Sequence, residues 1–185
     1  PALVAQNLDL PVFYHGFQTV LHIRGSGGEP DALVFTIPGV IAANGLNDRS
    51  VGVCVNAVTQ LAYSPKGLPV DFVIRGILRQ KSYEEAVRFL KEIDPAAPQN
   101  YLIGGPGQAA GFERSADRIA EFLPFPGAEF TYHTNHPLVN EDFTGKAVKN
   151  YMEDMSGGKY TINGDVIGWL QVPHSSMWYG ADACP

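Results

Sequence analysis

The sequence predicts an α+β sandwich in which two adjacent amphipathic helices pack against sheet. Three observations support this. Short strand patterns occur in pairs around Gly-rich and Asn-rich turns. Two amphipathic helix patterns, at 69–80 and 82–94, follow each other with no strand between them. Strand patterns then resume. This order favours a layered α+β sandwich over a doubly wound parallel sheet, in which strands and helices alternate.

The composition indicates one ordered globular domain of 185 residues, with 45% apolar and 17% charged residues. A net charge of −6, from 13 basic and 19 acidic residues, argues against nucleic-acid or anionic-membrane partners. No apolar run is long enough to span a bilayer, and two cysteines do not form a disulfide framework. We therefore expect a cytoplasmic protein, or an exported one if a signal peptide preceded residue 1.

The first strand is predicted from residue 2 to a polar end at 6–11, in the middle of a sheet. Asp9 lies there among apolar residues, where an ionised carboxylate needs hydrogen-bond donors. The other interpretation is an Asx turn before Pro11. Residues 17–24 and 32–37 then form a hairpin around a glycine run. That run has no lysine and opens no helix, so it is not a phosphate loop.

Residues 40–44 and 51–58 are the next two predicted strands, joined by the Asn/Asp/Gly-rich connection 45–50. Both faces of the second strand are largely apolar, so we expect it to be covered on both sides. Asn56 is then a polar group in a buried strand that needs partners or a ligand. Cys54 invites a nucleophile interpretation, but a small buried hydrophobe is the simpler role because no base is near it in sequence.

The helix pair has clear signals. Pro69 suits a first helical position, and an apolar stripe follows it at Val70, Val73, Ile74, Ile77 and Leu78. Ser82 and Glu85 form a capping box at the start of the second helix. Its stripe comprises Tyr83, Ala86, Val87, Leu90 and Ile93.

Beyond the helices, 100–103 and 109–113 are predicted to pair across a Gly-Pro-Gly turn, and 118–123 is predicted to pair with 129–132. After Phe143 the pattern weakens, with one short helix expected over 146–155.

The stretch from Tyr132 to Leu138 is the strongest candidate for chemistry, because it places polar side chains at the end of a predicted strand. In an extended chain His133 and Asn135 point to one face. A fixed Asn135 amide could stabilise the anionic oxygen of an acyl-transfer intermediate. The alternative is a solvated loop in which Asn and Thr cap local turns.

A metal site on His133 and His136, with His22 or His174, is a further alternative for the same stretch. Histidines three apart on a strand face opposite sides and cannot chelate one ion together, so no metal site is predicted.

Four segments in this order resemble a known group of amidases. They are Gln6-Asn7-Leu8-Asp9-Leu10, Gly45-Leu46-Asn47 continuing to Val51-Gly52-Val53-Cys54-Val55-Asn56, Gly67-Leu68-Pro69 with Arg75, and His133-Thr134-Asn135-His136. The group is the acyl-coenzyme A:6-aminopenicillanic acid acyltransferase (isopenicillin-N acyltransferase) family, related to choloylglycine hydrolase and penicillin V acylase. The resemblance covers about residues 2–143.

The resemblance implies an αββα N-terminal-nucleophile sandwich made by self-cleavage of a precursor. An N-terminal cysteine would attack an amide and form a thioester, with its own α-amine, of pKa about 7.7–8.0 when unperturbed, as base. By the same resemblance Asp9 orients that amine and thiol, and Asn135 supplies the oxyanion hole with Asn56 as a second polar contributor. Tyr132, His133 and His136 are the expected substrate-binding residues. Gln6 stands where the bile-salt branch has an arginine, which favours the acyltransferase-like branch.

The family's nucleophilic cysteine lies upstream of this sequence, and neither Cys54 nor Cys184 matches its place. Residues 144–185 also match the family poorly and contain no arginine. We therefore expect either part of a longer enzyme or an inactive, non-catalytic binding relative with the same sandwich. The expected partner is a small amide or acyl-thioester substrate, and a missing segment or partner chain from precursor cleavage. No cofactor is expected.

Overall fold

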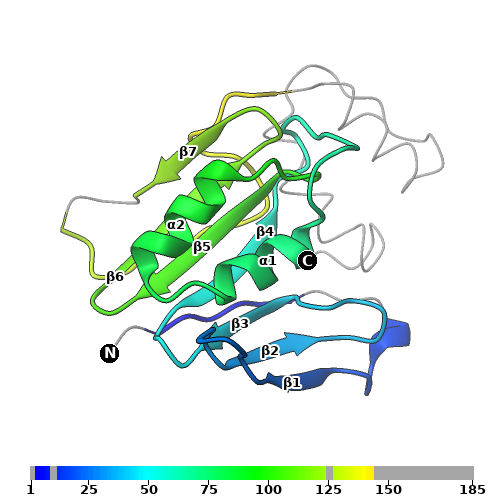
Figure 1. Cartoon of the computed structure of the whole chain (residues 1–185). Coiled ribbons are helices and arrows are strands. Elements are labelled where there is room, and N and C mark those ends of the chain that lie inside the picture. The colour runs from blue at the N-terminus through cyan, green and yellow to red at the C-terminus, as the bar shows by residue number, and fades with distance from the viewer. Residues whose placement is uncertain (1–2, 9–11, 124–126, 144–185) are drawn as a thin grey trace.

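The computed structural model describes residues 3–8, 12–123 and 127–143 (Figure 1). In it the strands form one antiparallel sheet whose spatial order follows the chain, from β1 to β7. The strands are β1 (Thr19–Ile23), β2 (Ala32–Thr36), β3 (Asn44–Asn47), β4 (Gly52–Ala57), β5 (Gln99–Gly105), β6 (Gln108–Arg114) and β7 (Ile119–Phe122). Two helices, α1 (Val70–Leu78) and α2 (Tyr83–Glu92), separate β4 from β5, and a short 3-10 turn, η1 (Val12–Tyr14), precedes β1.

Antiparallel pairing and an adjacent helix pair are therefore confirmed. The described residues form one sheet of seven strands, whereas two stacked sheets were predicted. The reason is that every described strand finds its chain neighbour as hydrogen-bonding partner, which extends a single meander.

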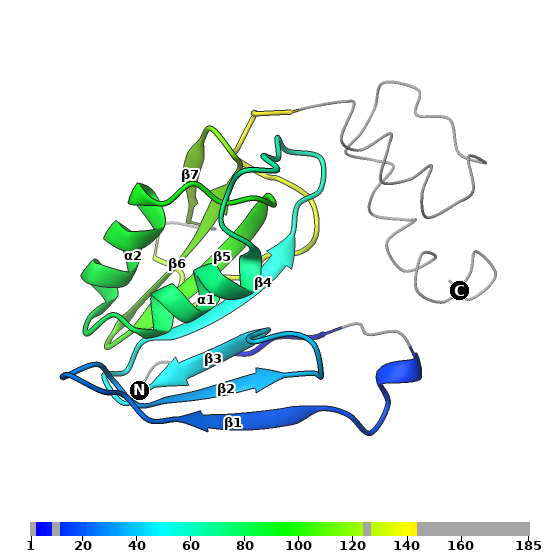
Figure 2. The ribbon, with the colours of Figure 1, turned by 45° about the vertical axis from the view of Figure 1, so that its right-hand side comes forward.

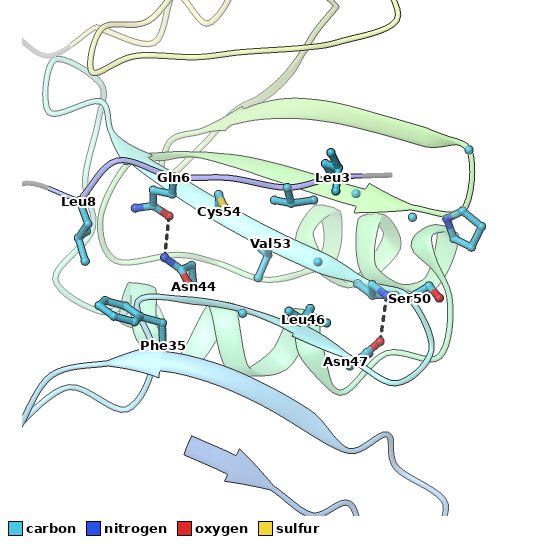
Figure 3. Close-up of a pocket in the computed structure, with 18 residues that line it drawn as sticks. Leu3, Gln6, Leu8, Phe35, Asn44, Leu46, Asn47, Ser50, Val53 and Cys54 are labelled. Atoms are coloured by element: carbon cyan, nitrogen blue, oxygen red, sulfur yellow. Dashed lines mark hydrogen bonds between the residues drawn. The ribbon is translucent and has the colours of Figure 1, made fainter. Parts of the chain in front are cut away.

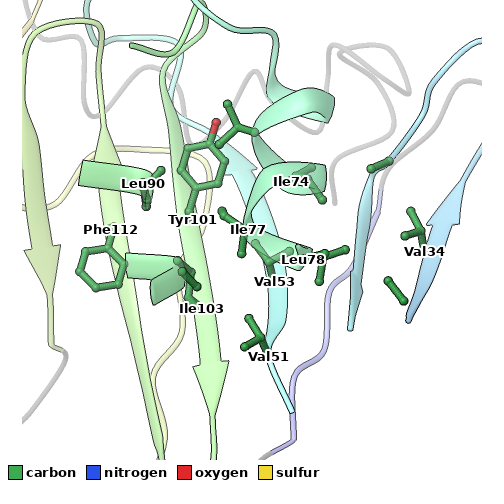
Figure 4. Packing of buried hydrophobic residues seen from close by; sticks show 14 of the residues in the cluster. Val34, Val51, Val53, Ile74, Ile77, Leu78, Leu90, Tyr101, Ile103 and Phe112 are labelled. Carbon is green, nitrogen blue, oxygen red and sulfur yellow. The ribbon is translucent and has the colours of Figure 1, made fainter. Parts of the chain in front are cut away.

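Both helices cover one face of the sheet, with α1 against β3 and β4 and α2 against β5 (Figures 1 and 2). The core lies between the helices and this helix face (Figure 4). Alternation in the strands supplies it, because Val53 and its register partner Ile103 both point toward the helices. Its largest fully buried side chains include Tyr101, Phe112, Ile74, Ile77 and Leu90. Each such aliphatic side chain stabilises the fold by roughly 1.5–3 kcal/mol.

The second helix begins as predicted. The Ser82 hydroxyl accepts a hydrogen bond from the backbone N–H of Glu85 at 3.2 Å, and the Glu85 carboxylate accepts from the N–H of Lys81 at 2.9 Å. At the other end the buried Arg114 guanidinium donates to the carbonyl of Ile93 at 2.6 Å. The residue that follows α2 is thus hydrogen-bonded to β6.

The sheet opens between β3 and β4. These strands share only two register pairs, Gly45 with Val53 and Leu46 with Gly52, while β4 and β5 share six. The backbone N–H of Val55 therefore lies beyond the β3 ladder, and it donates instead to the side-chain oxygen of Gln6 at 3.1 Å. This opening brings the N-terminal segment 3–8 into the sheet region.

One predicted strand has different bounds, and two others are not strands in the structure. The strand predicted at 40–44 is in fact β3, at 44–47. The cause is Asn47, whose side chain accepts from the N–H of Arg49 and Val51 and donates to the carbonyls of Leu78 and Gln80. These bonds connect the turn after residue 47 to the end of α1, so the strand has to reach residue 47.

Segment 3–8, predicted as a central strand, has no strand structure. It lies against the face opposite the helices, where Gly52 and Gly104 leave room for the Val4 side chain. Residues 129–132, predicted to pair with 118–123, are not a strand either, since β7 pairs with β6. The predicted helix at 146–155 lies outside the described residues.

Candidate functional site

A row of polar side chains crosses the face of the sheet that the helices leave uncovered. Register pairs join Asn56 on β4 to Asn100 on β5, and Asn100 to Glu113 on β6, so the three side chains share this face. The Asn100 amide donates to the Asn56 side-chain oxygen at 3.4 Å. Asn100 and Glu113 are fully buried, and the Asn100 oxygen has no hydrogen-bond partner among the described residues.

The loop 127–143 covers this polar row. Next to the row, the Phe122 ring of β7 contacts the rings of Tyr132 and His133 edge-on, at centroid distances of 6.5 and 5.6 Å. Farther along, the backbone N–H of Ala62 donates to the carbonyl of Asp142 at 2.9 Å. The loop therefore crosses the open face from β7 toward the residues that follow β4.

Glu113 lies at the centre of the contact between sheet and loop. Its carboxylate accepts from His133 Nε2 at 2.7 Å and from three successive backbone N–H groups, those of 138–140, at 2.6 to 3.0 Å. Burial raises the pKa of Glu113, but these four hydrogen bonds outweigh it, so the net pKa lies below the ordinary value of 4.5. Glu113 is therefore an ionised carboxylate whose charge is stabilised by hydrogen bonds from the loop.

Asn135 lies in the loop between His133 and residues 138–140, which all contact Glu113. Its side-chain Nδ2 donates to the carbonyl of Ala57 at 3.2 Å, and its own carbonyl accepts from Gln60 Nε2 at 3.4 Å. An asparagine amide carries two N–H donors, so one remains after the bond to Ala57.

A cavity of about 390 Å³ lies where the polar row, the loop and segment 3–8 meet. Its lining residues are Ala5, Gln6, Asn7, Cys54, Asn56, Leu102, Thr131, Tyr132, His133, Thr134 and Asn135. The cavity thus contains the two asparagines singled out from the sequence, together with Gln6 and Cys54. A buried hydroxyl at its wall, Thr131 Oγ1, has no partner among the described residues, so a ligand or water would find unused polar atoms here.

A larger cavity, of about 840 Å³, adjoins it and shares Gln6 and Cys54 (Figure 3). It occupies the opening between β3 and β4. Apolar side chains of Leu3, Val4, Leu8, Phe35 and Leu46 line it. The Gln6 oxygen accepts from both Asn44 Nδ2 at 3.3 Å and the N–H of Val55, so its amide nitrogen is directed away from the sheet (Figure 3).

Cys54 is buried in β4 between the two cavities, and burial raises the pKa of its thiol to about 11. A thiol with such a pKa is almost entirely protonated at neutral pH and is a poor nucleophile. The structure agrees with the expectation that Cys54 is a small buried hydrophobe.

The remaining predicted site residues lie as follows. Asp9 is outside the described residues. Tyr132 is half exposed at the cavity and His133 lines it, with both ring nitrogens near acceptors. His136 lies within hydrogen-bond distance of the Thr134 hydroxyl, at 2.8 Å. Burial and the proximity of His133 lower the pKa of His136, while Glu113 acts in the opposite direction.

Sequence reasoning missed Glu113 and Asn100. Both lie in strands whose alternation was recognised, and counting across the predicted hairpin would have placed them beside each other. The partner of Glu113 in the loop, 20 residues away, has no local signal.

Within residues 3–8, 12–123 and 127–143, no group of three or more His, Cys, Asp or Glu side chains could hold a metal ion. No helix in this part of the chain is long and apolar enough to cross a membrane.

Two family models match the chain. That of acyl-coenzyme A:6-aminopenicillanic acid acyl-transferase matches residues 33–157, and that of the Immune inhibitor A peptidase M6 catalytic domain matches residues 130–185. The chain is also 54% identical, over 50 residues, to Immune inhibitor A of Bacillus thuringiensis subsp. alesti. That stretch is 26% of this chain and only 7% of the relative.

Among solved structures, the Caenorhabditis elegans orthologue of N-acylethanolamine-hydrolyzing acid amidase is similar, with a TM-score of 0.57 and 18% identity, over 91% of this chain and 78% of that one. Penicillin V acylase from Agrobacterium tumefaciens gives a TM-score of 0.47 and 17% identity, over 80% and 49%. The first likeness shows a shared fold.

Proposed function

Because this chain belongs to the acyl-coenzyme A:6-aminopenicillanic acid acyl-transferase family, we propose that it forms the larger part of an amide-bond hydrolase or acyltransferase. The reaction proceeds through a thioester on an N-terminal cysteine. The observation that carries the proposal is the convergence of Asn56 and Asn135 on one cavity beside segment 3–8. Their amides come from two distant parts of the chain, and fixed amide donors of this kind can stabilise the oxyanion of an acyl-transfer intermediate.

The proposed nucleophile is a cysteine upstream of residue 1, exposed by self-cleavage of a precursor. Its α-amine takes the thiol proton, and the thiolate attacks the substrate carbonyl carbon. The C=O pair of electrons moves onto oxygen, where the remaining N–H of Asn135 and the amide of Asn56 stabilise the charge. Collapse of this intermediate expels the amine, which takes the proton, and leaves a thioester. Water or an acceptor amine then releases the acyl group.

Asp9 keeps its proposed role of orienting the cysteine amine and thiol. Segment 3–8, which precedes it directly in sequence, lines both cavities. The apolar lining of the larger cavity suits the acyl part of a substrate, which would lie next to the proposed oxyanion hole.

We also propose that a second sheet stacks on the open face in the complete enzyme, giving the αββα sandwich. Supporting this, Leu33 and Leu46 are register partners on that face and are 45% and 56% exposed. A pair of apolar side chains so placed would be covered by a second layer.

Of the expected substrate-binding residues, Tyr132 is best placed, since its ring is exposed at the cavity. His136 stays a proposed contributor. The side chain of His133 has no exposed surface, which leaves it less suited to contact a substrate.

The similarity to Immune inhibitor A does not carry a peptidase proposal. It spans a small part of that relative, and the described part of the matched stretch, 130–143, packs on the sheet of the acyltransferase-like fold.

The test compares this 185-residue chain with a cysteine-bearing form, in which the natural upstream segment precedes residue 1. The proposal predicts amidase activity and an acyl-enzyme mass in the cysteine-bearing form, and loss of both when that cysteine is replaced by alanine. The 185-residue chain is the matched control and should be inactive. Substrate binding without turnover by the cysteine-bearing form would favour the non-catalytic binding relative instead.

A further inference from the structure

Two sets of contacts hold the loop that carries Asn135, one on each side of that residue. Two residues before it, His133 Nε2 lies 2.7 Å from the Glu113 carboxylate. Three to five residues after it, the backbone N–H groups of 138–140 donate to the same carboxylate. One side chain of β6 therefore holds both ends of the turn that presents Asn135.

We call the bonds from His133 and residues 138–140 to the Glu113 carboxylate the anchor. The backbone of Glu113 adds to it. Its carbonyl accepts from the side chain of Asn140 at 2.9 Å, and Asn140 also donates to the carbonyl of Arg118 at 3.2 Å. Asn140 is 1% exposed and Glu113 is fully buried, so water does not compete for these bonds. The bonds to the carboxylate itself have a charged acceptor, and such bonds are roughly twice as strong as bonds between neutral groups.

By contrast, the bonds that Asn135 itself makes are long and neutral. The two distances, to Ala57 and from Gln60, are 3.2 and 3.4 Å. Such bonds cannot define the direction of an amide to the tenths of an ångström that an oxyanion hole requires. The precision must come from the anchor at Glu113.

The arrangement around His133 supports an ionic anchor. Its Nε2 faces the carboxylate, and its Nδ1 lies 2.6 Å from the carbonyl oxygen of Thr134. Both neighbours accept hydrogen bonds, so each ring nitrogen is placed to donate one. A ring used in this way has no nitrogen left for a substrate.

We propose that Glu113 is the positioning residue of this site, with His133 as its partner: the buried carboxylate fixes the loop 133–140 so that the Asn135 amide points into the cavity. This inference rests on the proposed function for the role of Asn135, but not for the anchor itself. It assigns His133 to the loop and not to substrate binding.

The first experiment tests the anchor without any activity. Amide hydrogen exchange is followed in wild type, in Glu113→Gln and in Glu121→Gln, an exposed carboxylate on the neighbouring strand that serves as the matched control. We expect slow exchange at residues 138–140 in wild type and in Glu121→Gln, and at least tenfold faster exchange there in Glu113→Gln, with core amides of β4 and β5 unchanged. Equal protection in all three proteins would overturn the inference.

If Glu113→Gln does not fold, His133→Gln and the ring nitrogens of wild type decide. His133→Gln keeps one donor, so residues 138–140 should stay protected while the segment 132–135 loses protection. In wild type the ¹⁵N signals of the His133 ring should show both nitrogens as hydrogen-bond donors. An unprotonated ring nitrogen would contradict the anchor as described.

The second experiment uses the cysteine-bearing form. Glu113→Gln should lower kcat at least tenfold with KM nearly unchanged, and should have little further effect in the Asn135→Ala background, because both changes remove the same donor. If Asn135→Ala lowers kcat but Glu113→Gln keeps the wild-type kcat, the positioning role is overturned and the proposed function stays intact. No effect of Asn135→Ala would refute the proposed function, and the exchange data would then judge the anchor by itself.

Discussion

The side-chain amide of Asn135 donates to the backbone carbonyl of Ala57, at the end of β4, across a gap of 78 residues in sequence. This bond brings the loop 127–143 next to the strand that carries Asn56. It uses one of the two N–H groups of Asn135 and leaves the other for a ligand. The geometry of the candidate site therefore depends on how strand and loop are held, and several consequences can be measured.

Cys54 should be chemically inert in the folded protein. With a pKa of about 11, only about one thiol in a thousand is ionised at pH 8. In a Cys184→Ser background, iodoacetamide should modify Cys54 very slowly in buffer and at an ordinary thiol rate in urea. Rapid labelling of the native chain would show an accessible, reactive thiol, and the assignment of the nucleophile to an upstream cysteine would need revision.

Gly76→Ala should destabilise the fold although alanine is the better helix former. A Cβ at residue 76 of α1 would lie 2.1 Å from Cζ of the Phe89 ring of α2. We expect a loss of about 1–3 kcal/mol in the free energy of unfolding, measured with urea, against the gain of about 1 kcal/mol from helix propensity.

Phe89→Leu provides the control for this contact. In its background Gly76→Ala should cost clearly less, because the ring that a Cβ would meet is gone. A stabilising effect of Gly76→Ala in the wild-type background would mean that the helices are farther apart than described.

The stability of the protein should fall in acid partly because of Glu113. Its pKa in the folded state is below the ordinary 4.5, so ionised Glu113 stabilises the fold above that pH. As the pH falls from about 4.5 toward the lowered pKa, this contribution is lost. The difference in unfolding free energy between wild type and Glu113→Gln should therefore shrink below pH 4.5. A constant difference for Glu113→Gln would show that the carboxylate is not held as an anion.

Local patterns were sufficient to predict the helices and most of the hairpins. The stripe from Val70 to Leu78 and the cap at Ser82 are signals within one or two turns of a helix, and the structure confirms both. The β5–β6 hairpin follows from the Pro106-Gly107 turn in the same way. Short motifs along the chain also indicated the family, and the match to the family model over residues 33–157 confirms it.

Contacts between distant residues account for what could not be predicted. Asn47 bonds to the end of α1, 31 and 33 residues away, and this determines where β3 ends. The alternation at 129–132 resembles a strand, but Glu113 and Phe122 hold the loop on the open face instead of at the sheet edge. For the same reason the sequence singled out Asn56 and Asn135, which line one cavity, but not the carboxylate that connects sheet and loop.

The most direct test of the account is the kcat of Asn135→Ala in the cysteine-bearing form. One fixed amide donor to an oxyanion is typically worth roughly 2.7–4 kcal/mol, or 10²–10³ in rate. We predict that Asn135→Ala lowers kcat by about that factor with fold and KM nearly unchanged, and that Asn135→Asp is worse because it opposes the developing charge. Glu129→Gln, a change at an exposed side chain of the same loop outside the anchored residues 133–140, is the matched control and should keep wild-type kcat. A wild-type kcat for Asn135→Ala would contradict the oxyanion role on which the proposed function depends.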